Sequence, residues 1–445
     1  MIAVEEGNEN TELQRYDAVV VGGGLAGLTS AAYLTKSGKK VLLLERGNPG
    51  GRAFTLNVRG FKINYGAHAI YGRDTSILGK FESELGIKIE WLDFSPEKAK
   101  YDLGDTLTDV PANLKGLYRT KTLKGADKLK FTFEIVKTLL HAQKGDPDLS
   151  IKEWMEKQRL SDEVAETMLT LASSNFFTNE PEKIPSNVFF TYYRRLFKSK
   201  KPVAYIAGGW QSLIQEFIRV IEENGGTIKK MESVESVVVT EGKVTEVQTK
   251  EGNYFADDFV FCIPPRELIN VFAETGVRDS LKRYVNYQPS YVFIYDVGLS
   301  ARVDVPYTYI YDETNKIFIT DISYYDAKCV PEGGQLLQAI AYLREDEIDN
   351  PEKMDEYKEK IEQLYDKHFA GWRENLVVPR VTKKAIAQEI KWVMNQQPMP
   401  LTLPEYQNLF FAGDWCEGSG QLSELSFTSA YRSSHLLLEK SLVKL

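Results

Sequence analysis

Apolar blocks separated by short polar or glycine-rich stretches run along the whole 445-residue chain. Residues 16–21 (Tyr-Asp-Ala-Val-Val-Val) are mostly β-branched and apolar, which is typical of a buried strand in a parallel sheet. A glycine cluster follows, residues 25–37 carry Ala and Leu at helical spacing, and Gly38 marks the end of that helix. Residues 41–44 (Val-Leu-Leu-Leu) form the next apolar run. The pattern predicts a strand–helix–strand unit near the start of the chain.

The rest of the chain changes character twice. Between about residues 94 and 201 helical patterns dominate, and they predict helices over residues 126–141 and 150–171. After Pro202 the α/β rhythm returns, with a helix to about Glu223 and a strand pair around the turn at Glu241-Gly242. Residues 290–343 alternate like strands, residues 351–369 form a charged helix, and residues 408–412 form a last strand before a final helix.

The glycine cluster carries the first chemical signal. Gly22-Gly23-Gly24-Leu25-Ala26-Gly27 matches GxGxxG directly after a strand and at the start of a helix. In such a loop Gly22 permits the tight turn, Gly24 lets the backbone approach a pyrophosphate, and Gly27 lets helix and strand pack closely. Glu45 ends the second strand about 20 residues further on, where a carboxylate can bind ribose hydroxyls. Together these features predict dinucleotide binding, and they leave the choice between FAD and NAD open.

A second block follows Glu45. Arg46 leads into Gly50-Gly51-Arg52 and then Thr55, a paired glycine with a fixed cation that suits a bound phosphate. Glu45 with this block resembles the second FAD signature of the flavin amine oxidase superfamily, which includes amine oxidases, carotenoid desaturases and protoporphyrinogen oxidase. Residues 60–68, ending in Ala67-His68, are similar to the next block of that family, where the chain passes beside the flavin.

The middle and the end of the chain carry the same resemblance. Residues 207–234 are similar to the desaturase-type stretch, in which the position of Val234 holds the adenine through its backbone. Residues 409–415 (Leu-Phe-Phe-Ala-Gly-Asp-Trp) resemble the last FAD motif of the family, in which the position of Asp414 binds the ribityl and diphosphate part. This chain has Leu425 where the family often has glycine, in a last helix that would point its N-terminus at the flavin. The cofactor-binding candidates are Gly22, Gly24, Leu25, Ala26, Gly27, Glu45, Arg46, Gly51, Arg52, Val234, Gly413, Asp414 and Leu425.

The resemblance implies an α/β fold with two domains. One is an FAD-binding Rossmann-like (GR2-type) domain assembled from residues 1–93, 202–280 and 375–445. The other is an α+β substrate domain with a mixed sheet plus helices, from residues 94–201 and 281–374. The cofactor implied is FAD, held at the join between the two domains.

Missing sequence motifs limit the reactions that the chain is expected to catalyse. A second GxGxxG and a CxxC pair are missing, which disfavours disulfide-reductase chemistry. The stretch 287–293 lacks the lysine that amine oxidases of this superfamily usually carry, so the pattern favours the desaturase branch. The resemblance then implies hydride transfer from an apolar or cyclic substrate to flavin N5, with oxygen or a quinone as electron acceptor. An amine oxidase proper, a flavin-dependent isomerase without net oxidation and a non-catalytic FAD-binding protein remain as alternatives.

Composition limits the partners. The net charge of −8 argues against nucleic acid, whose phosphates require a surplus of Lys and Arg. The start of the chain has no secretory pattern and no apolar stretch reaches the roughly 20 residues of a spanning helix, so a cytoplasmic protein is expected, with a peripheral membrane contact left open. His141, His368 and His435 are too scattered for a metal site, and none is expected. His68 is the candidate catalytic residue, and a hydrogen-bonded structural histidine is its alternative.

Overall fold

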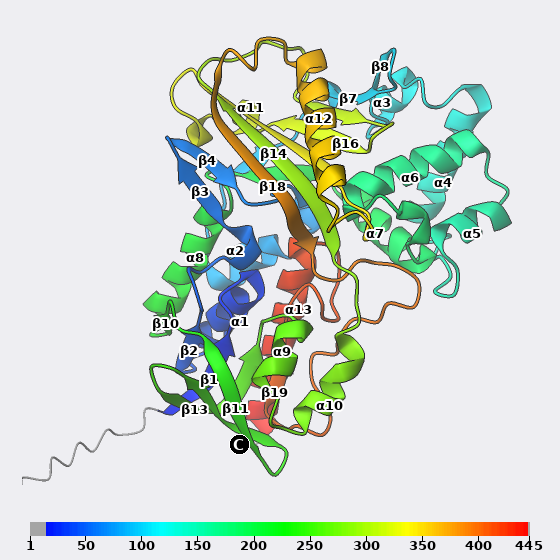
Figure 1. Cartoon of the computed structure of the whole chain (residues 1–445). Coiled ribbons are helices and arrows are strands. Elements are labelled where there is room, and N and C mark those ends of the chain that lie inside the picture. The colour runs from blue at the N-terminus through cyan, green and yellow to red at the C-terminus, as the bar shows by residue number, and fades with distance from the viewer. Residues whose placement is uncertain (1–14, 444–445) are drawn as a thin grey trace, which may run out of the picture.

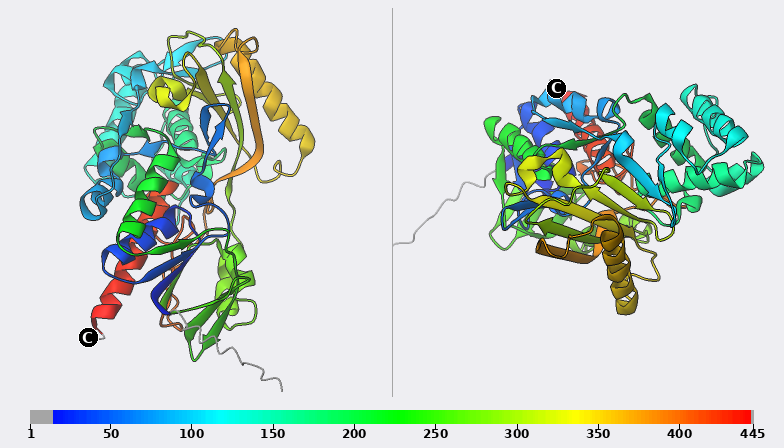
Figure 2. Two further views of the ribbon diagram at one scale, coloured as in Figure 1. Left: turned by 90° about the vertical axis from the view of Figure 1, so that its left-hand side faces the viewer. Right: turned by 90° about the horizontal axis from the view of Figure 1, so that it is seen from above.

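The computed structural model describes residues 15–443 and shows two halves, each built on a seven-stranded sheet (Figure 1, Figure 2). The sheet of the lower half in Figure 1 contains β1 (Arg15–Val21), β2 (Val41–Leu44), β10 (Thr227–Lys229), β11 (Val234–Thr240), β12 (Lys243–Thr249), β13 (Asn253–Phe261) and β19 (Leu409–Phe411). The sheet of the upper half contains β7 (Ala99–Asp102), β8 (Leu107–Asp109), β14 (Ser290–Leu299), β15 (Tyr309–Asp312), β16 (Ile317–Asp321), β17 (Gln335–Tyr342) and β18 (Leu376–Gln388). This mixture of parallel and antiparallel sheets with covering helices confirms the α/β expectation.

The first sheet is buried on both faces. β1 pairs in parallel with β2 and β13, which confirms the predicted strand–helix–strand unit. Alternate β1 side chains enter different cores: Ala18 and Val20 face one side, Val19 and Val21 the other. The helices of this half are α1 (Leu25–Lys36), α2 (Leu78–Leu85), α8 (Trp210–Glu223), α9 (Pro265–Val271), α10 (Val277–Leu281) and α13 (Ser423–Val443). Helices α1, α2, α8 and α13 cover the first face, whereas α9 and α10 cover the second. Burial on both faces explains why the strand sequence is continuously apolar.

The second sheet separates two different environments. Phe293 and Tyr295 of β14 pack against the long helix α12 (Pro351–His368), whereas Val292 and Ile294 face an aromatic cluster on the other side. That cluster lies toward a helical insert made of α3 (Leu114–Arg119), α4 (Gly125–Leu139), α5 (Ile151–Lys157), α6 (Asp162–Phe176) and α7 (Ser186–Lys198). The insert extends sideways from the two sheets in Figure 1 and has its own apolar core.

Short elements connect the two halves. β3 (Thr55–Val58) pairs with β4 (Phe61–Asn64), and β9 (Val203–Ile206) pairs with both β5 (Ile70–Tyr71) and β6 (Trp91–Asp93). The short helix α11 (Ile322–Tyr325) follows β16. These elements bring residues 64–71, which carry His68, between the two large sheets.

Two sequence expectations need correction. The helix predicted over residues 150–171 is two helices, α5 and α6, because Arg159 adopts a φ of +53° and Ser161 begins the next helix. The domain boundary predicted at residue 375 is also wrong, since β18 pairs with β14 in the second sheet. β18 carries a proline and the basic residues Arg380, Lys383 and Lys384, and this composition fits an edge strand of either sheet. The rest of the division into domains stays a prediction.

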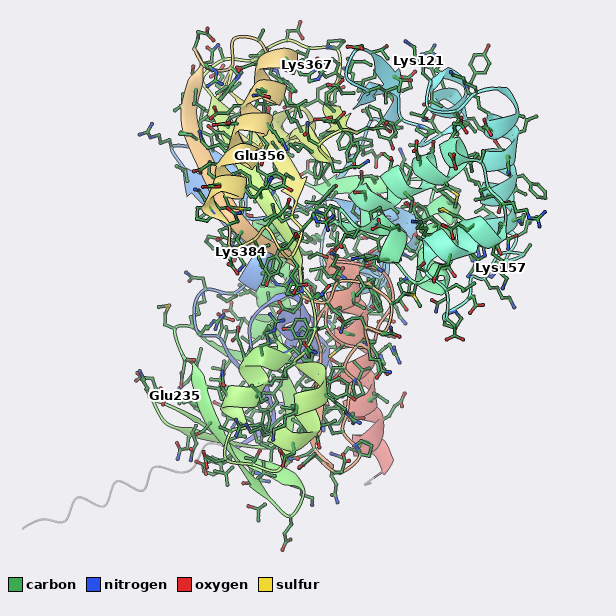
Figure 3. All side chains as sticks on the ribbon, turned by 45° about the vertical axis from the view of Figure 1, so that its right-hand side comes forward. Lys121, Lys157, Glu235, Glu356, Lys367 and Lys384 are labelled. Carbon is green, nitrogen blue, oxygen red and sulfur yellow. The ribbon has the colours of Figure 1, made fainter. Side chains whose placement is uncertain are left out.

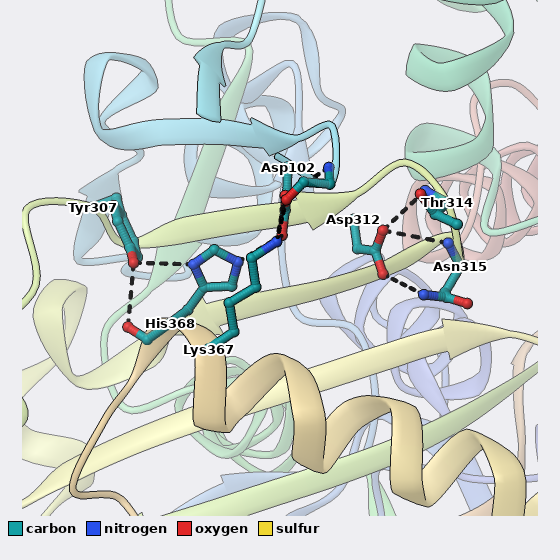
Figure 4. Close-up of polar contacts among 8 residues, drawn as sticks. Asp102, Tyr307, Asp312, Thr314, Asn315, Lys367 and His368 are labelled. Atoms are coloured by element: carbon teal, nitrogen blue, oxygen red, sulfur yellow. Dashed lines mark hydrogen bonds and ion pairs between the residues drawn. The ribbon is translucent and has the colours of Figure 1, made fainter. Parts of the chain in front are cut away.

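A polar cluster joins the end of α12 to β7, next to the edge strand β8 of the second sheet (Figure 4). The Asp102 carboxylate at the end of β7 accepts hydrogen bonds from Lys367 Nζ at 2.6 Å and His368 Nε2 at 2.7 Å. Tyr307 Oη lies 3.1 Å from His368 Nδ1. Because Asp102 is 2% exposed, the end of α12 is tied to β7 by a buried ionic contact.

Candidate active site

A cavity of about 610 Å³ lies where β1, β2 and β13 end. Much of its wall comes from four parts of the chain: the glycine loop, the block after Glu45, the start of β11 and the turn after β19. The cofactor-binding candidates that line it are Gly22, Gly24, Leu25, Ala26, Glu45, Arg46, Gly51, Arg52, Val234, Gly413 and Asp414. Folding therefore gathers most of the candidates around one space. Gly27 and Leu425 do not line it.

Gly22, Gly24 and Gly27 of the first loop are glycines for different physical reasons. Gly22 has a φ of +98° and donates its N–H to Leu44 O at 2.8 Å, so the turn itself needs glycine. A Cβ on Gly27 would lie 1.8 Å from Gly22 O, so close packing of α1 on β1 requires glycine there. A Cβ on Gly24 would meet nothing within 4 Å and would project into the cavity. The protein itself gives no reason for glycine at position 24, and a ligand seated against the backbone supplies one.

The start of α1 offers free backbone donors. Gly24 is the N-cap and has no side-chain cap, and no acidic residue occurs in the first turn. The first intrahelical bond runs from Leu28 N to Gly24 O at 2.9 Å, so the preceding N–H groups, including those of Leu25 and Ala26, have no intrahelical acceptor. Free N–H groups and the positive end of the helix dipole favour an anion at this point.

Glu45 ties the loop to the end of β2. Its Oε2 accepts the N–H of Gly23 at 2.6 Å, and its Oε1 accepts the N–H of Gly47 at 2.7 Å. The side chain is buried but lines the cavity, and each carboxylate oxygen keeps a lone pair for a further donor such as a ribose hydroxyl. One carboxylate can thus hold the loop and contact a ligand.

A charged cluster forms another part of the cavity wall. Arg52 donates to Asp414 Oδ1 at 2.5 Å and lies 4.0 Å from Glu389 Oε2. Asp414 Oδ2 accepts the N–H of Glu389 at 2.8 Å, and Tyr287 Oη donates to Glu389 Oε1 at 2.5 Å. Burial raises the pKa of the Glu389 carboxyl. Both oxygens of Asp414 thus already accept protein donors, so a cofactor contact at this position would share them.

Sequence reasoning missed Glu389 and Tyr287. Glu389 follows β18 directly, and Tyr287 lies three residues before β14. Two neighbouring strands of the second sheet therefore place both residues beside the cavity of the first sheet. The chain offers no local signal for either residue, because Glu389 lies more than 100 positions from Tyr287 and more than 300 from Arg52.

Two of the cofactor-binding candidates, Gly27 and Leu425, lie outside the cavity, and Arg46 stands at its rim. Leu425 is fully buried in the core beside Trp415, so the start of α13 reaches the cavity through Ser423 and Ser426 instead. Gly27 contributes through packing, as its missing Cβ shows. Arg46 stands at the rim, 68% exposed, and pairs with Glu267 at 2.8 Å.

A second cavity, of about 330 Å³, lies between the second sheet and the helical insert. Ten aromatic side chains line it: Tyr71, Phe94, Tyr101, Phe131, Phe177, Tyr193, Phe197, Tyr205, Tyr309 and Phe318. Ala67 and Ala69 line this aromatic cavity and also the glycine-lined cavity. The two spaces therefore meet on either side of residue 68.

His68 faces the aromatic cavity at this junction. It is 8% exposed, and neither ring nitrogen has a side-chain hydrogen-bond partner among the described residues. Its ring centroid lies 5.2 Å from that of Tyr205. Burial lowers the pKa of His68 to about 4, so the ring is neutral near pH 7. Its catalytic role stays a prediction.

Within residues 15–443 no group of three or more His, Cys, Asp and Glu side chains is arranged to hold a metal ion. Over the same range no helix is both long and apolar enough to cross a bilayer.

Known proteins share this architecture. A crystal structure of an oxidoreductase from Methanosarcina mazei superposes with a TM-score of 0.79 at 20% identity, covering 95% of this chain and all of that one. Cyclohexylamine oxidase from Brevibacterium oxydans gives a TM-score of 0.70 at 15% identity, covering 96% of this chain and 99% of that one. At such identities these likenesses describe the fold.

Sequence relatives and a family match identify the family in addition to the fold. The 15-cis-phytoene desaturase of Solanum lycopersicum is 27% identical over 273 residues, which are 56% of this chain and 46% of the relative. The chain thus aligns with about half the length of the curated relatives it matches. Residues 25–438 match the family described as flavin containing amine oxidoreductase, and that match spans both cavities. The chain belongs to the flavin containing amine oxidoreductase family.

Proposed function

We propose that this protein binds FAD in the glycine-lined cavity and oxidises an apolar or cyclic substrate held in the aromatic cavity. When bound, FAD supplies the hydride acceptor, its N5 atom. The observation that carries the proposal is the meeting of two chemically opposite cavities at Ala67 and Ala69. One side can hold a charged nucleotide, and the other can hold an apolar molecule beside it.

The fit of FAD to the first cavity is supported by three observations. The open space beyond Gly24 leaves room for a diphosphate against the backbone, and the start of α1 offers N–H groups to it. Glu45 keeps acceptor capacity for ribose hydroxyls. Members of the family to which the chain belongs bind FAD. Val234, Arg52 and Asp414 would hold the adenine and ribityl–diphosphate parts, as the family resemblance implies.

The lining of the aromatic cavity favours an apolar substrate over a protonated amine. The lining residues, all in the described part of the chain, include no Asp or Glu, but they include Lys200 and Lys201. Both lysines are exposed at the rim, and Lys201 pairs with Asp93 at 2.6 Å, so the lining offers a cationic amine no carboxylate, and burying an unpaired charge there is unfavourable. The partial likeness to phytoene desaturases points the same way.

The side chains of the aromatic cavity would act mainly by position. Oxidation of a C–H bond next to a π-system needs little acid–base assistance, so orientation and exclusion of water supply most of the help. His68, neutral near pH 7, would shape the junction and would not carry charge there. An electron acceptor, oxygen or a quinone, would then complete the cycle.

The test begins with the absorption spectrum of the purified protein, before and after incubation with excess FAD. We expect a flavin spectrum, and its bleaching under anaerobic conditions by an apolar polyene or a porphyrinogen, but not by simple amines. A folded protein that stays colourless in excess FAD would overturn the proposal. Bleaching by amines alone would identify an amine oxidase. Product formation without consumption of an acceptor would identify an isomerase, and no response to any substrate would support a non-catalytic flavoprotein.

A further inference from the structure

Large apolar side chains are exposed on one side of the helical insert. Among the described residues, eleven large hydrophobic side chains are exposed, and six of these lie between positions 114 and 140. They are Leu114 (81% exposed), Tyr118 (82%), Leu129 (75%), Phe133 (60%), Val136 (42%) and Leu140 (73%), and we call them the α3–α4 face. Scattered exposed apolar residues are ordinary, but a concentration in one short segment marks an interaction surface.

The exposed side chains recur at helical spacing on each of the two helices. Residues 129, 133 and 136 of α4, with Leu140 just after it, follow steps of four, three and four, which place them on one side of a helix. Leu114 and Tyr118 stand one turn apart on α3. The opposite side of α4 carries the buried Phe131, in the core of the insert. Helix α4 is therefore apolar on two sides, and folding uses only one of them.

Positive charge surrounds the α3–α4 face. Residues 114–144 contain eight basic residues, Lys115, Arg119, Lys121, Lys124, Lys128, Lys130, Lys137 and Lys144, and only two acidic ones, in a chain whose net charge is −8. Lys121, labelled in Figure 3, lies at the outer part of the insert. Both acids already have partners: Glu134 is buried and pairs with Lys137 at 3.1 Å, and Asp127 accepts from Ser161 Oγ at 2.7 Å.

Basic side chains also lie over the exposed rings. Lys128 Nζ stands 5.8 Å from the centre of the Tyr118 ring, and Lys137 Nζ stands 5.4 Å from that of Phe133. Long basic side chains that extend past apolar groups can place their charges at lipid phosphates while the rings enter the layer below.

We propose that the α3–α4 face docks on an anionic lipid bilayer, with its apolar side chains inserted at the head-group level and its basic residues against lipid phosphates. An apolar stripe flanked by Lys and Arg is the pattern of an interfacial helix. A second copy of this chain fits poorly, because it would bring two basic faces together.

The α3–α4 face lies close to the aromatic cavity. Phe131 and Ile135 of α4 line that cavity, as do Val110 and Pro111 just before α3. A bilayer docked on the outer side of α4 would lie one helix away from the cavity. Vesicle binding is measured without substrate, so the docking proposal stands or falls independently of the proposed function.

The test is co-sedimentation of the full-length protein with vesicles of phosphatidylcholine alone or mixed with phosphatidylserine. We expect binding to the mixed vesicles that weakens as salt rises, because salt screens surface charge. The variant Leu129→Ser/Phe133→Ser/Leu140→Ser should lose about 10-fold or more in binding, since it removes inserted apolar area. Met231→Ser is the matched control, because Met231 is 73% exposed on the other half of the molecule, and it should bind like the wild type.

A charge variant separates the electrostatic contribution to vesicle binding from the apolar contribution. Lys121→Glu/Lys124→Glu should reduce binding to mixed vesicles while circular dichroism and retained flavin stay unchanged. The proposal is overturned if the wild type fails to bind mixed vesicles, or if the triple serine variant binds them as well as the wild type does. It is equally overturned if the serine variant abolishes only a concentration-dependent dimer in sedimentation equilibrium, since the face would then join two copies of the chain.

Discussion

The two cavities of this molecule meet at two alanines but are lined by different chemical groups. Backbone amides, glycines and an ion-pair cluster form much of the wall of the glycine-lined cavity, whereas ten side-chain rings line the aromatic cavity. A wall made of backbone has a shape set by φ, ψ and missing Cβ atoms, so almost any added side chain occludes it. A wall made of rings is set by packing between distant segments, and it tolerates conservative exchange. The comparison predicts where substitutions should matter most.

The largest effect is expected at Gly24. Gly24→Val places a side chain in the space where a Cβ meets nothing within 4 Å, so the fold should survive at a cost of about 1 kcal/mol for a poorer N-cap. FAD affinity should fall by about 100-fold, because losing two hydrogen bonds to phosphate costs about 1.5 kcal/mol each. Fluorescence titration of the apoprotein with FAD measures the change.

Gly27→Val provides the contrast within the same loop. Its Cβ would lie 1.8 Å from Gly22 O, so this variant should fail to fold and should leave no soluble protein to titrate. A Gly24→Val protein that binds FAD like the wild type would mean that the diphosphate does not lie against this loop.

Filling the aromatic cavity should be the next largest effect. Ser174 lines that cavity and not the glycine-lined one, so Ser174→Phe should leave the flavin in place. Anaerobic reduction by substrate should slow by about 100-fold, the usual cost of misplacing a substrate by about 1 Å. Reduction by dithionite serves as the control and should match the wild type. Equal slowing of both reductions would place the defect at the flavin.

Asp102 lies outside both cavities, so a substitution there tests what stabilises the second half of the molecule. Although burial opposes it, hydrogen bonds from Lys367 and His368 hold the pKa of Asp102 below its ordinary value. Its ionic contact therefore stabilises the fold above the unfolded pKa of about 3.9 and is lost as pH falls through the lower folded pKa. Asp102→Asn should lower the free energy of unfolding by about 2 kcal/mol at pH 7, less than for a fully buried pair, because Lys367 is 45% exposed.

Urea denaturation at pH 7 and at pH values below 4 measures this difference. The gap between wild type and Asp102→Asn should narrow as pH falls, while the affinity for FAD at pH 7 stays the same. A gap that is constant with pH would assign the effect to packing rather than to charge.

The smallest effect is expected at His68. A residue that moved a proton in the rate-limiting step would cost about 100-fold or more when replaced. Burial keeps His68 neutral down to a pKa of about 4, so His68→Gln should change substrate-driven flavin reduction by less than about 10-fold. The wild-type rate should also show no inflection near pH 6.5. A larger loss in His68→Gln, together with such an inflection, would make His68 a catalytic residue.

The sequence by itself determined the parts of the molecule that depend on neighbouring residues. The strand, glycine loop and helix of residues 15–36 follow from apolar runs and from glycine positions a few residues apart, and the structure places them as expected. The family and the α/β fold followed from the same local blocks, and the family match and the topology confirm both.

Only the tertiary structure decided the features that join distant segments. The Arg52–Asp414 contact spans 362 positions, and Glu389 reaches it only because β18 belongs to the second sheet, contrary to the predicted boundary. Helix α4 is apolar on two sides, and periodicity cannot tell which side packs inward. Local patterns fix backbone conformation, whereas burial and partnership depend on which surfaces the folded chain brings together.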